Sequence, residues 1–152
     1  MAESQLVASH RADAEIFHGE VCKERIQKLL EDFSLPKGLL PLENFEEMGF
    51  NRSSGFLWLK QKKKQAHKFK GTSNTVMYEP VITAFVEDRR LQKVTGVKSK
   101  VLLVAVKISD MFIEDPASGM ISFGTSIGIS RGHPISTFEL EDENGDAQNS
   151  EN

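Results

Sequence analysis

The chain has 152 residues, of which 39% are hydrophobic, and it carries a net charge of -3. This length fits one domain with a substantial core, and the mild acidity argues against general affinity for nucleic acids. The single cysteine, Cys22, excludes an intramolecular disulfide and a zinc site built from several thiolates. The sequence shows neither a secretory signal pattern nor an apolar run long enough to span a membrane. It therefore predicts a soluble, cytoplasmic protein without a transmembrane segment.

The first ten residues are expected to be flexible, either disordered or loosely helical, and a helical pattern follows from about Arg11 to Phe33. Its apolar residues recur at spacings of one, three and four, which places them along one helix face: Val21, Cys22, Ile26, Leu29, Leu30 and Phe33. Gly19 is expected to mark a kink or a break between two shorter helices. Cys22 lies within the apolar stripe, and this predicts a buried structural thiol more than a reactive one.

After Pro36 the hydrophobic period shortens to about two, and turn residues become frequent. The pattern predicts strands at residues 42–50, 56–59, 76–86, 91–95 and 101–123, with short extended pieces at 127–129 and 135–138. Such strands favour an antiparallel sheet that curls or closes. We expect a mainly β fold of the β-rich α+β type: a curled antiparallel sheet or partly open β-barrel with one N-terminal amphipathic helix. The domain is expected to span residues 11–139, and residues 140–152 are predicted to be a disordered acidic tail.

Residues 101–123 are predicted to form a long hairpin in the core. This stretch begins with the longest apolar run of the chain and contains a strong turn signal, Asp115 to Gly119. Asp115 suits the opening of a type I turn, and Gly119 suits a left-handed position. An unbroken strand over residues 101–114 would extend about 45 Å. A bend or bulge is therefore expected near Ser109 and Asp110.

A basic segment occupies residues 60–70. Its lysines could contact the phosphates of anionic lipid headgroups, and the residues expected to do so are Lys62, Lys63, Lys64 and Lys68. The alternative is a solvated hairpin whose lysines keep an exposed sheet edge from pairing. Nucleic acid is the weaker candidate partner, because base stacking needs more aromatic residues than Phe69 supplies.

The sequence contains no recognisable catalytic, cofactor-binding or metal-binding pattern. The four histidines share no ligand spacing, and no nucleophile elbow is present. Ser118 and His133 could join a Ser/His/Asp site only if the fold happened to bring them together. No catalytic residue, metal ligand or cofactor is therefore predicted.

Four segments resemble a plant family called domain of unknown function 538. They read LLEDFSLPKGLLP from residue 29, LQKVTGVK from residue 91, IEDPASGMISF from residue 113 and PISTF from residue 134. The resemblance covers about residues 20–139 and implies a mostly β domain, a partly open barrel behind an N-terminal helix. For family members, a similarity to lipid-binding bactericidal/permeability-increasing proteins and an esterase-like role have been proposed. Many members are secreted, whereas this chain, with its lysine-rich segment and no signal peptide, resembles an intracellular branch.

The resemblance and the expected fold favour a non-enzymatic binding module for an apolar or lipid-like ligand, since the mouths of such barrels often hold ligands. The aromatic residues that could line the site are Phe56, Trp58, Tyr78 and Phe112. Each of them could instead be packed in the core. Two further hypotheses stay open: an ester hydrolase, and a protein-interaction or regulatory module with no small ligand. The sequence does not indicate an oligomeric state.

Overall fold

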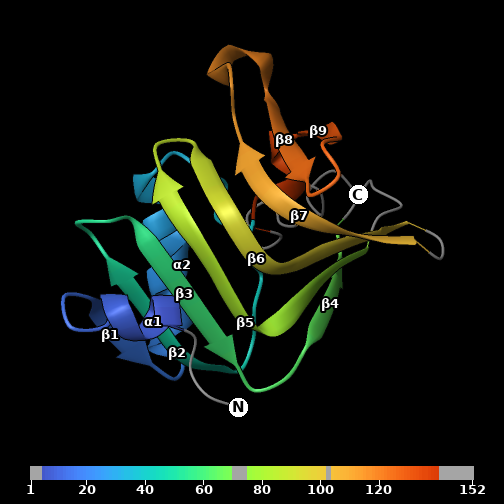
Figure 1. The fold of residues 1–152 in the computed structure, drawn as a ribbon. Coiled ribbons are helices and arrows are strands. Elements are labelled where there is room, and N and C mark those ends of the chain that lie inside the picture. The colour runs from blue at the N-terminus through green and yellow to red at the C-terminus, as the bar shows by residue number, and fades with distance from the viewer. Residues whose placement is uncertain (1–4, 70–74, 102–103, 141–152) are drawn as a thin grey trace, which may run out of the picture.

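The computed structural model describes residues 5–69, 75–101 and 104–140 (Figure 1). Their helices and strands follow in the order α1 (Gln5–His10), β1 (Glu15–His18), α2 (Val21–Asp32), β2 (Phe45–Asn51), β3 (Phe56–Gln61), β4 (Gln65–Lys68), β5 (Thr75–Glu87), β6 (Arg90–Val101), β7 (Val104–Phe112), β8 (Met120–Thr125) and β9 (Ser130–Pro134). The described residues also form two short 3-10 helices, η1 (Pro116–Ser118) and η2 (Ile135–Phe138). The predicted mainly β fold is confirmed.

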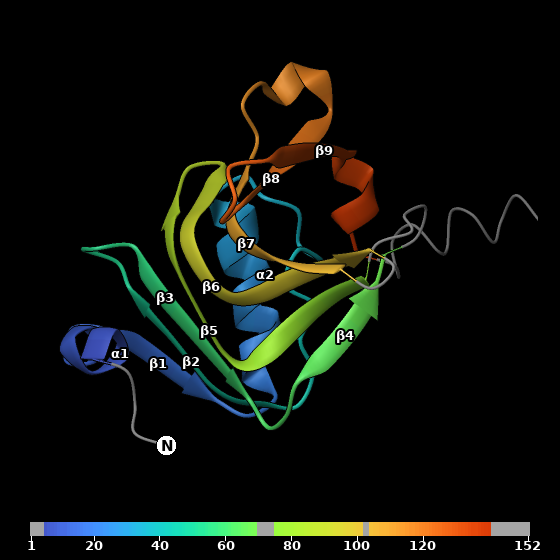
Figure 2. The ribbon, with the colours of Figure 1, turned by 45° about the vertical axis from the view of Figure 1, so that its right-hand side comes forward.

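The described strands form one antiparallel sheet in the order β1-β2-β3-β5-β6-β7-β8-β9, with β4 paired to β5. The sheet curls around α2 (Figure 2). In the part of the chain that the structure describes, β1 and β9 remain edge strands, so the sheet does not close. The predicted curled antiparallel sheet is therefore confirmed, and a closed barrel is not formed.

Helix α2 packs its apolar stripe into the concave side of the sheet. Cys22, Ile26, Leu29 and Leu30 are all buried there. Burial raises the pKa of the Cys22 thiol, and the negative charge of Glu47 raises it further. A buried thiol with a raised pKa is a poor nucleophile, in agreement with the structural role predicted for it.

The N-terminal segment covers part of the opposite, outer face of the sheet. The sequence predicts a flexible start that is disordered or loosely helical, and in the structure Gln5–His10 form helix α1, which buries Val7 against Phe56 and Trp58. The ring of His10 stacks on Phe56 with ring centroids 4.5 Å apart. A small second core therefore lies outside the sheet, beneath α1.

The predicted helix from Arg11 is wrong for its first part, because residues Glu15–His18 form strand β1 instead. Ile16 packs against the outer core and Phe17 against the inner one, which is the alternation of a strand. Gly19 ends this strand with a φ of +72°, and α2 begins at Val21. Packing against both faces of the sheet overrides the helical spacing in this stretch.

The 101–123 region holds the predicted hairpin, but its first strand begins later than expected. Strand β6 ends at Val101, which pairs with Val104, the first residue of β7. The side chain of Val104 is 63% exposed. The apolar run therefore contains a chain reversal and is not a core strand; Leu102 and Leu103 lie outside the described residues. Strands β7 and β8 do form the hairpin, and their pairing is irregular between Ile108 and Asp110, which confirms the predicted bulge.

The turn of this hairpin also agrees with the prediction. Asp115 caps η1 by accepting a hydrogen bond from the Ala117 N–H at 3.0 Å, and Gly119 is left-handed with a φ of +70°. By contrast, residues 135–138 are not extended but form η2, whose Phe138 packs against Phe69 and Phe123. The predicted acidic tail lies outside the described residues, apart from Leu140.

The pairing of β5 with β6 is irregular on either side of Gly96, and this irregularity supplies a test of the fold. Gly96 has a φ of +83°, and an added Cβ would collide with the Val81 carbonyl oxygen. Gly96→Ala should therefore lower the free energy of unfolding by about 3 kcal/mol, through both backbone strain and the clash. Urea denaturation measures this loss.

Gly128→Ala is the matched control, since Gly128 has a similar φ of +85° but no atom within 4 Å of the position that the added methyl group would occupy. It should lose only about 1 kcal/mol, the cost of a left-handed alanine. Equal losses in the two variants would contradict the steric role assigned to Gly96.

Candidate functional site

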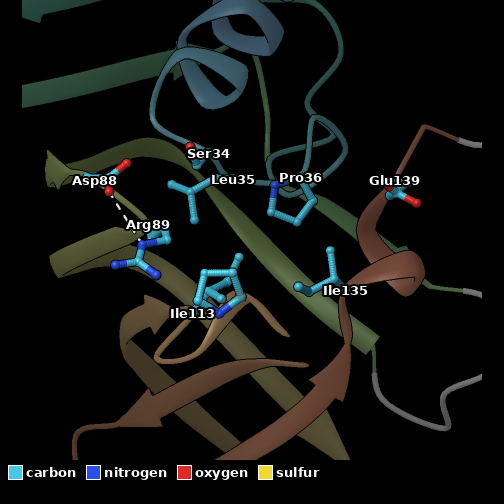
Figure 3. Close-up of a pocket in the computed structure, with 9 residues that line it drawn as sticks. Ser34, Leu35, Pro36, Asp88, Arg89, Ile113, Ile135 and Glu139 are labelled. Carbon is cyan, nitrogen blue, oxygen red and sulfur yellow. Dashed lines mark ion pairs between the residues drawn. The ribbon is translucent and has the colours of Figure 1, made fainter. Parts of the chain in front are cut away.

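An open cavity of about 450 Å³ lies where four separate parts of the chain meet (Figure 3). They are the loop after α2, the β5–β6 turn, the chain from the end of β7 into η1, and η2. The lining residues are Ser34, Leu35, Pro36, Asp88, Arg89, Ile113, Pro116, Ile135 and Glu139. The volume falls in the range of small-molecule sites, roughly 300–1,000 Å³.

The middle of the cavity is apolar and its ends are charged. Figure 3 shows Leu35, Pro36, Ile113 and Ile135 between the two ends, with Asp88 and Arg89 at one and Glu139 at the other. Leu35 and Ile113 are largely buried, and Ile135 is half-buried. Apolar walls with a few polar groups are the usual composition of a ligand site.

Backbone hydrogen bonds join the walls of the cavity to one another. The Arg89 N–H donates to the Phe33 carbonyl at 2.7 Å, and the Ile113 N–H donates to the Arg89 carbonyl at 2.9 Å. On the other side, the Gly38 N–H donates to the Phe138 carbonyl at 2.8 Å. The cavity is therefore a pre-formed part of the fold.

Two lining residues have left-handed backbones although neither is glycine. Ser34 has a φ of +60° and Arg89 a φ of +59°. Such conformations cost about 1 kcal/mol or more each and gather at functional sites. Arg89 is held by its backbone hydrogen bonds to Phe33 and Ile113, and the Ser34 N–H donates to the Glu31 carbonyl at 3.0 Å at the end of α2.

Arg89 is the cation of the cavity. Its Nε lies 3.4 Å from Asp88 Oδ2, and the two side chains are 37% and 69% exposed. An ion pair this exposed contributes little free energy, about 0–1 kcal/mol. The guanidinium group can therefore exchange this partner for an anionic group of a ligand at small cost.

The aromatic residues proposed from the sequence as pocket lining do not line this cavity. Phe56 and Trp58 are buried in the outer core beneath α1. Tyr78 lies in the inner core, where burial raises its pKa and its hydroxyl donates to the Leu39 carbonyl at 3.1 Å. Phe112 is half-buried under the Arg90 guanidinium, 4.4 Å from the ring centroid.

The four lysines proposed as headgroup contacts are all exposed. Lys62, Lys63 and Lys64 lie in the turn between β3 and β4, and Lys68 is the last residue of β4. Strand β4 pairs with β5 and lies off the main path of the sheet. Its position also agrees with the alternative prediction, in which lysines protect a sheet edge.

Ser118 and His133 make separate structural contacts. The Ser118 hydroxyl donates to the Asp115 carbonyl at 2.7 Å and accepts from the Met120 N–H at 3.1 Å, so it serves the turn. His133 packs against Phe123, with ring centroids 5.4 Å apart, and its burial, together with the charge of Arg131, lowers its pKa. These contacts favour a turn role for Ser118 and a packing role for His133 over a Ser/His/Asp catalytic site.

The outer core contains a buried carboxylate, Glu47, which the sequence does not reveal. Arg11 donates to it through both terminal nitrogens, at 2.7 and 3.3 Å, and Trp58 Nε1 donates at 2.7 Å. His18 Nε2 lies at 3.2 Å and Lys60 Nζ at 3.7 Å. Burial alone raises the pKa of Glu47, but the hydrogen bonds and the positive charges outweigh it and lower this pKa to about 2.

The cavity could not be predicted from the sequence, because its residues come from four distant segments. A signal was nevertheless present. Three of the four segments that carry the family resemblance, at residues 29–41, 113–123 and 134–138, supply lining residues. Binding residues lie disproportionately on loops that a rigid scaffold positions.

Within the described ranges, no group of three or more histidine, cysteine, aspartate or glutamate side chains could hold a metal ion. None of the described helices is long and apolar enough to cross a bilayer.

Residues 26–139 match the model of a family described as a protein of unknown function, DUF538. All the cavity residues fall within this range, whereas α1 and β1 precede it. Neither the curated proteins nor the solved structures give a significant match to the chain. Since the family match spans most of the sequence, the chain belongs to the DUF538 family.

Proposed function

We propose that this protein is a non-enzymatic binding module that holds an apolar or lipid-like ligand in the cavity between Leu35, Ile113 and Ile135. The observation that carries the proposal is the pre-formed cavity of about 450 Å³ with apolar walls and charged ends. Leu35, Pro36, Ile113 and Ile135 would contact the apolar body of the ligand. Arg89 would bind a carboxylate or phosphate at its end, because its present partner is a weak, exposed one.

The contacts of Ser118 favour this proposal over an ester hydrolase. Its hydroxyl already makes two hydrogen bonds within the turn, to Asp115 and Met120. A nucleophilic serine instead needs a base within hydrogen-bond reach. The cavity favours ligand binding over a protein-interaction module with no small ligand, because such a module does not need a cavity.

The direct test is binding of cis-parinaric acid, a fluorescent fatty acid, followed by its fluorescence enhancement. Ile135→Trp adds bulk to a half-buried wall and should weaken binding at least about tenfold by filling the cavity. Arg89→Gln should weaken it about tenfold by removing a charge-assisted hydrogen bond. The methyl ester of the probe should bind equally to wild type and Arg89→Gln.

Ile127→Trp is the matched control, because Ile127 is 66% exposed and does not line the cavity. It should bind as the wild type does. Absence of binding to the wild type, or unchanged affinity in Ile135→Trp, would overturn the proposal. Thermal unfolding of each variant verifies that the fold is intact.

A further inference from the structure

Strand register gathers four lysines from three different strands, β4, β6 and β7. One row across the sheet runs through β4, β5, β6 and β7. In it Lys68 lies opposite Thr75, Thr75 lies opposite Lys100, and Lys100 lies opposite Ala105. In the neighbouring row, Ala66 faces Met77, Met77 faces Lys98, and Lys98 faces Lys107. Residues directly opposite one another in an antiparallel pair share a face of the sheet.

The two rows are adjacent and lie on the same face, since Lys98 and Lys100 are two residues apart on β6. We name the face formed by Lys68, Lys98, Lys100 and Lys107 the lysine face. It is the outer side of the sheet at the end where β4, β5, β6 and β7 run side by side (Figure 1). Lys68, Lys100 and Lys107 are exposed, and the Lys98 side chain is 39% exposed.

The clustering of these lysines lowers the stability of the sheet. Lys98 and Lys107 are direct cross-strand partners, and like charges in this position destabilise a sheet. Lys98 has one carboxylate in the described contacts, Glu79 at 4.0 Å. A concentration of positive charge on a protein of net charge -3 indicates a partner that carries the opposite charge.

The shape of the face indicates which anionic partner fits. Between the lysines stand small or unbranched side chains, from Ala66, Thr75, Met77 and Ala105, so the ammonium groups can meet a flat surface together. Lysine is a compact point charge that binds phosphate without a fixed geometry. Aromatic side chains, on which bases of single-stranded nucleic acid would stack, do not occur at these register positions.

We propose that the lysine face docks the protein on an anionic lipid bilayer. Lys68, Lys98, Lys100 and Lys107 contact lipid phosphates and carboxylates, and Val104, which is 63% exposed at the β6–β7 turn, reaches the interfacial region. Lys62, Lys63 and Lys64 in the β3–β4 turn add to the attraction. The ligand cavity lies at the opposite ends of β5 and β6, beside Asp88 and Arg89, so it remains free in the docked protein.

The test is co-sedimentation with vesicles of phosphatidylcholine that contain about one-third phosphatidylserine, with pure phosphatidylcholine vesicles alongside. The wild type should bind the anionic vesicles and not the pure phosphatidylcholine vesicles. About 0.5 M salt should release it, because the Debye length then falls to a few ångströms. Replacing Lys68, Lys98, Lys100 and Lys107 together by alanine should reduce partitioning at least about tenfold.

The control variant has the same charge change elsewhere: Lys23, Lys28, Lys37 and Lys93 replaced by alanine. It should keep most of the binding, because these lysines do not lie on the lysine face. Equal losses in the two variants would show a net-charge effect and overturn the proposal. It would also be overturned if the wild type bound an oligonucleotide, measured by fluorescence anisotropy, but not the anionic vesicles. The lysine-face variant should still bind cis-parinaric acid, so failure of this proposal is distinguishable from failure of the ligand proposal.

Discussion

Replacing Glu47 with glutamine is expected to lower the free energy of unfolding by about 3 kcal/mol at pH 7, because the carboxylate is far better stabilised as an anion than as a neutral group. Its pKa lies at about 2 instead of the ordinary 4.5. Arg11 and Trp58 donate to it directly, each at 2.7 Å. Glutamine keeps the shape but loses the charge, so these donors lose their strongest partner.

The same group predicts how stability depends on pH. A lowered pKa in the folded state means that the unfolded chain binds a proton to Glu47 first as the pH falls. The contribution of Glu47 is therefore fully present above about pH 4.5 and is lost progressively between about pH 4.5 and pH 2. The variant Glu47→Gln should lack this part of the acid transition.

Urea denaturation at a series of pH values between about 2 and 7 measures both effects. Glu46→Gln is the matched control, since Glu46 is the preceding residue of β2 and is exposed. It should change stability by less than about 0.5 kcal/mol. If the free energy of unfolding of Glu47→Gln fell with pH as steeply as that of the wild type, the Glu47 carboxylate would not have the role assigned to it.

Local patterns predicted much of the fold because local chemistry determines those parts. The apolar stripe of α2 follows from side-chain spacing, and the Asp115 to Gly119 turn follows from turn chemistry. The helix predicted from Arg11 failed because Ile16 and Phe17 pack on opposite faces of the sheet. Periodicity within one segment carries no information about such packing.

The two proposed binding surfaces depend on contacts between distant segments, and the sequence alone does not specify these contacts. The cavity needs Leu35, Ile113 and Ile135 to meet, and the lysine face needs the register of four strands. Lys68 was recognisable within the basic segment, whereas Lys98 and Lys107 belong to two different strands, β6 and β7. Only strand pairing shows that they are neighbours.

Truncating Trp58 to alanine should lower the free energy of unfolding by about 4 kcal/mol, as expected for a fully buried tryptophan. Trp58 is 0% exposed and lies in the outer core with Val7 and Phe56. The truncation also removes the donor to Glu47 Oε2. A tryptophan that lined a ligand site, as the sequence also allowed, would instead affect binding of cis-parinaric acid with a smaller loss of stability.

Gly49 allows this packing to be tested separately from the hydrogen bond. Gly49 lies opposite Trp58 in the β2–β3 register, and a Cβ at Gly49 would collide with the indole ring. Gly49→Ala should therefore destabilise the wild type by about 2 kcal/mol, in the range of overpacked cores. In the Trp58→Ala background the same methyl group enters the space that the ring has left, and most of this loss should disappear. Additive losses in the double variant would mean that the ring and Gly49 are not in contact, since contacting residues couple by about 0.5–3 kcal/mol.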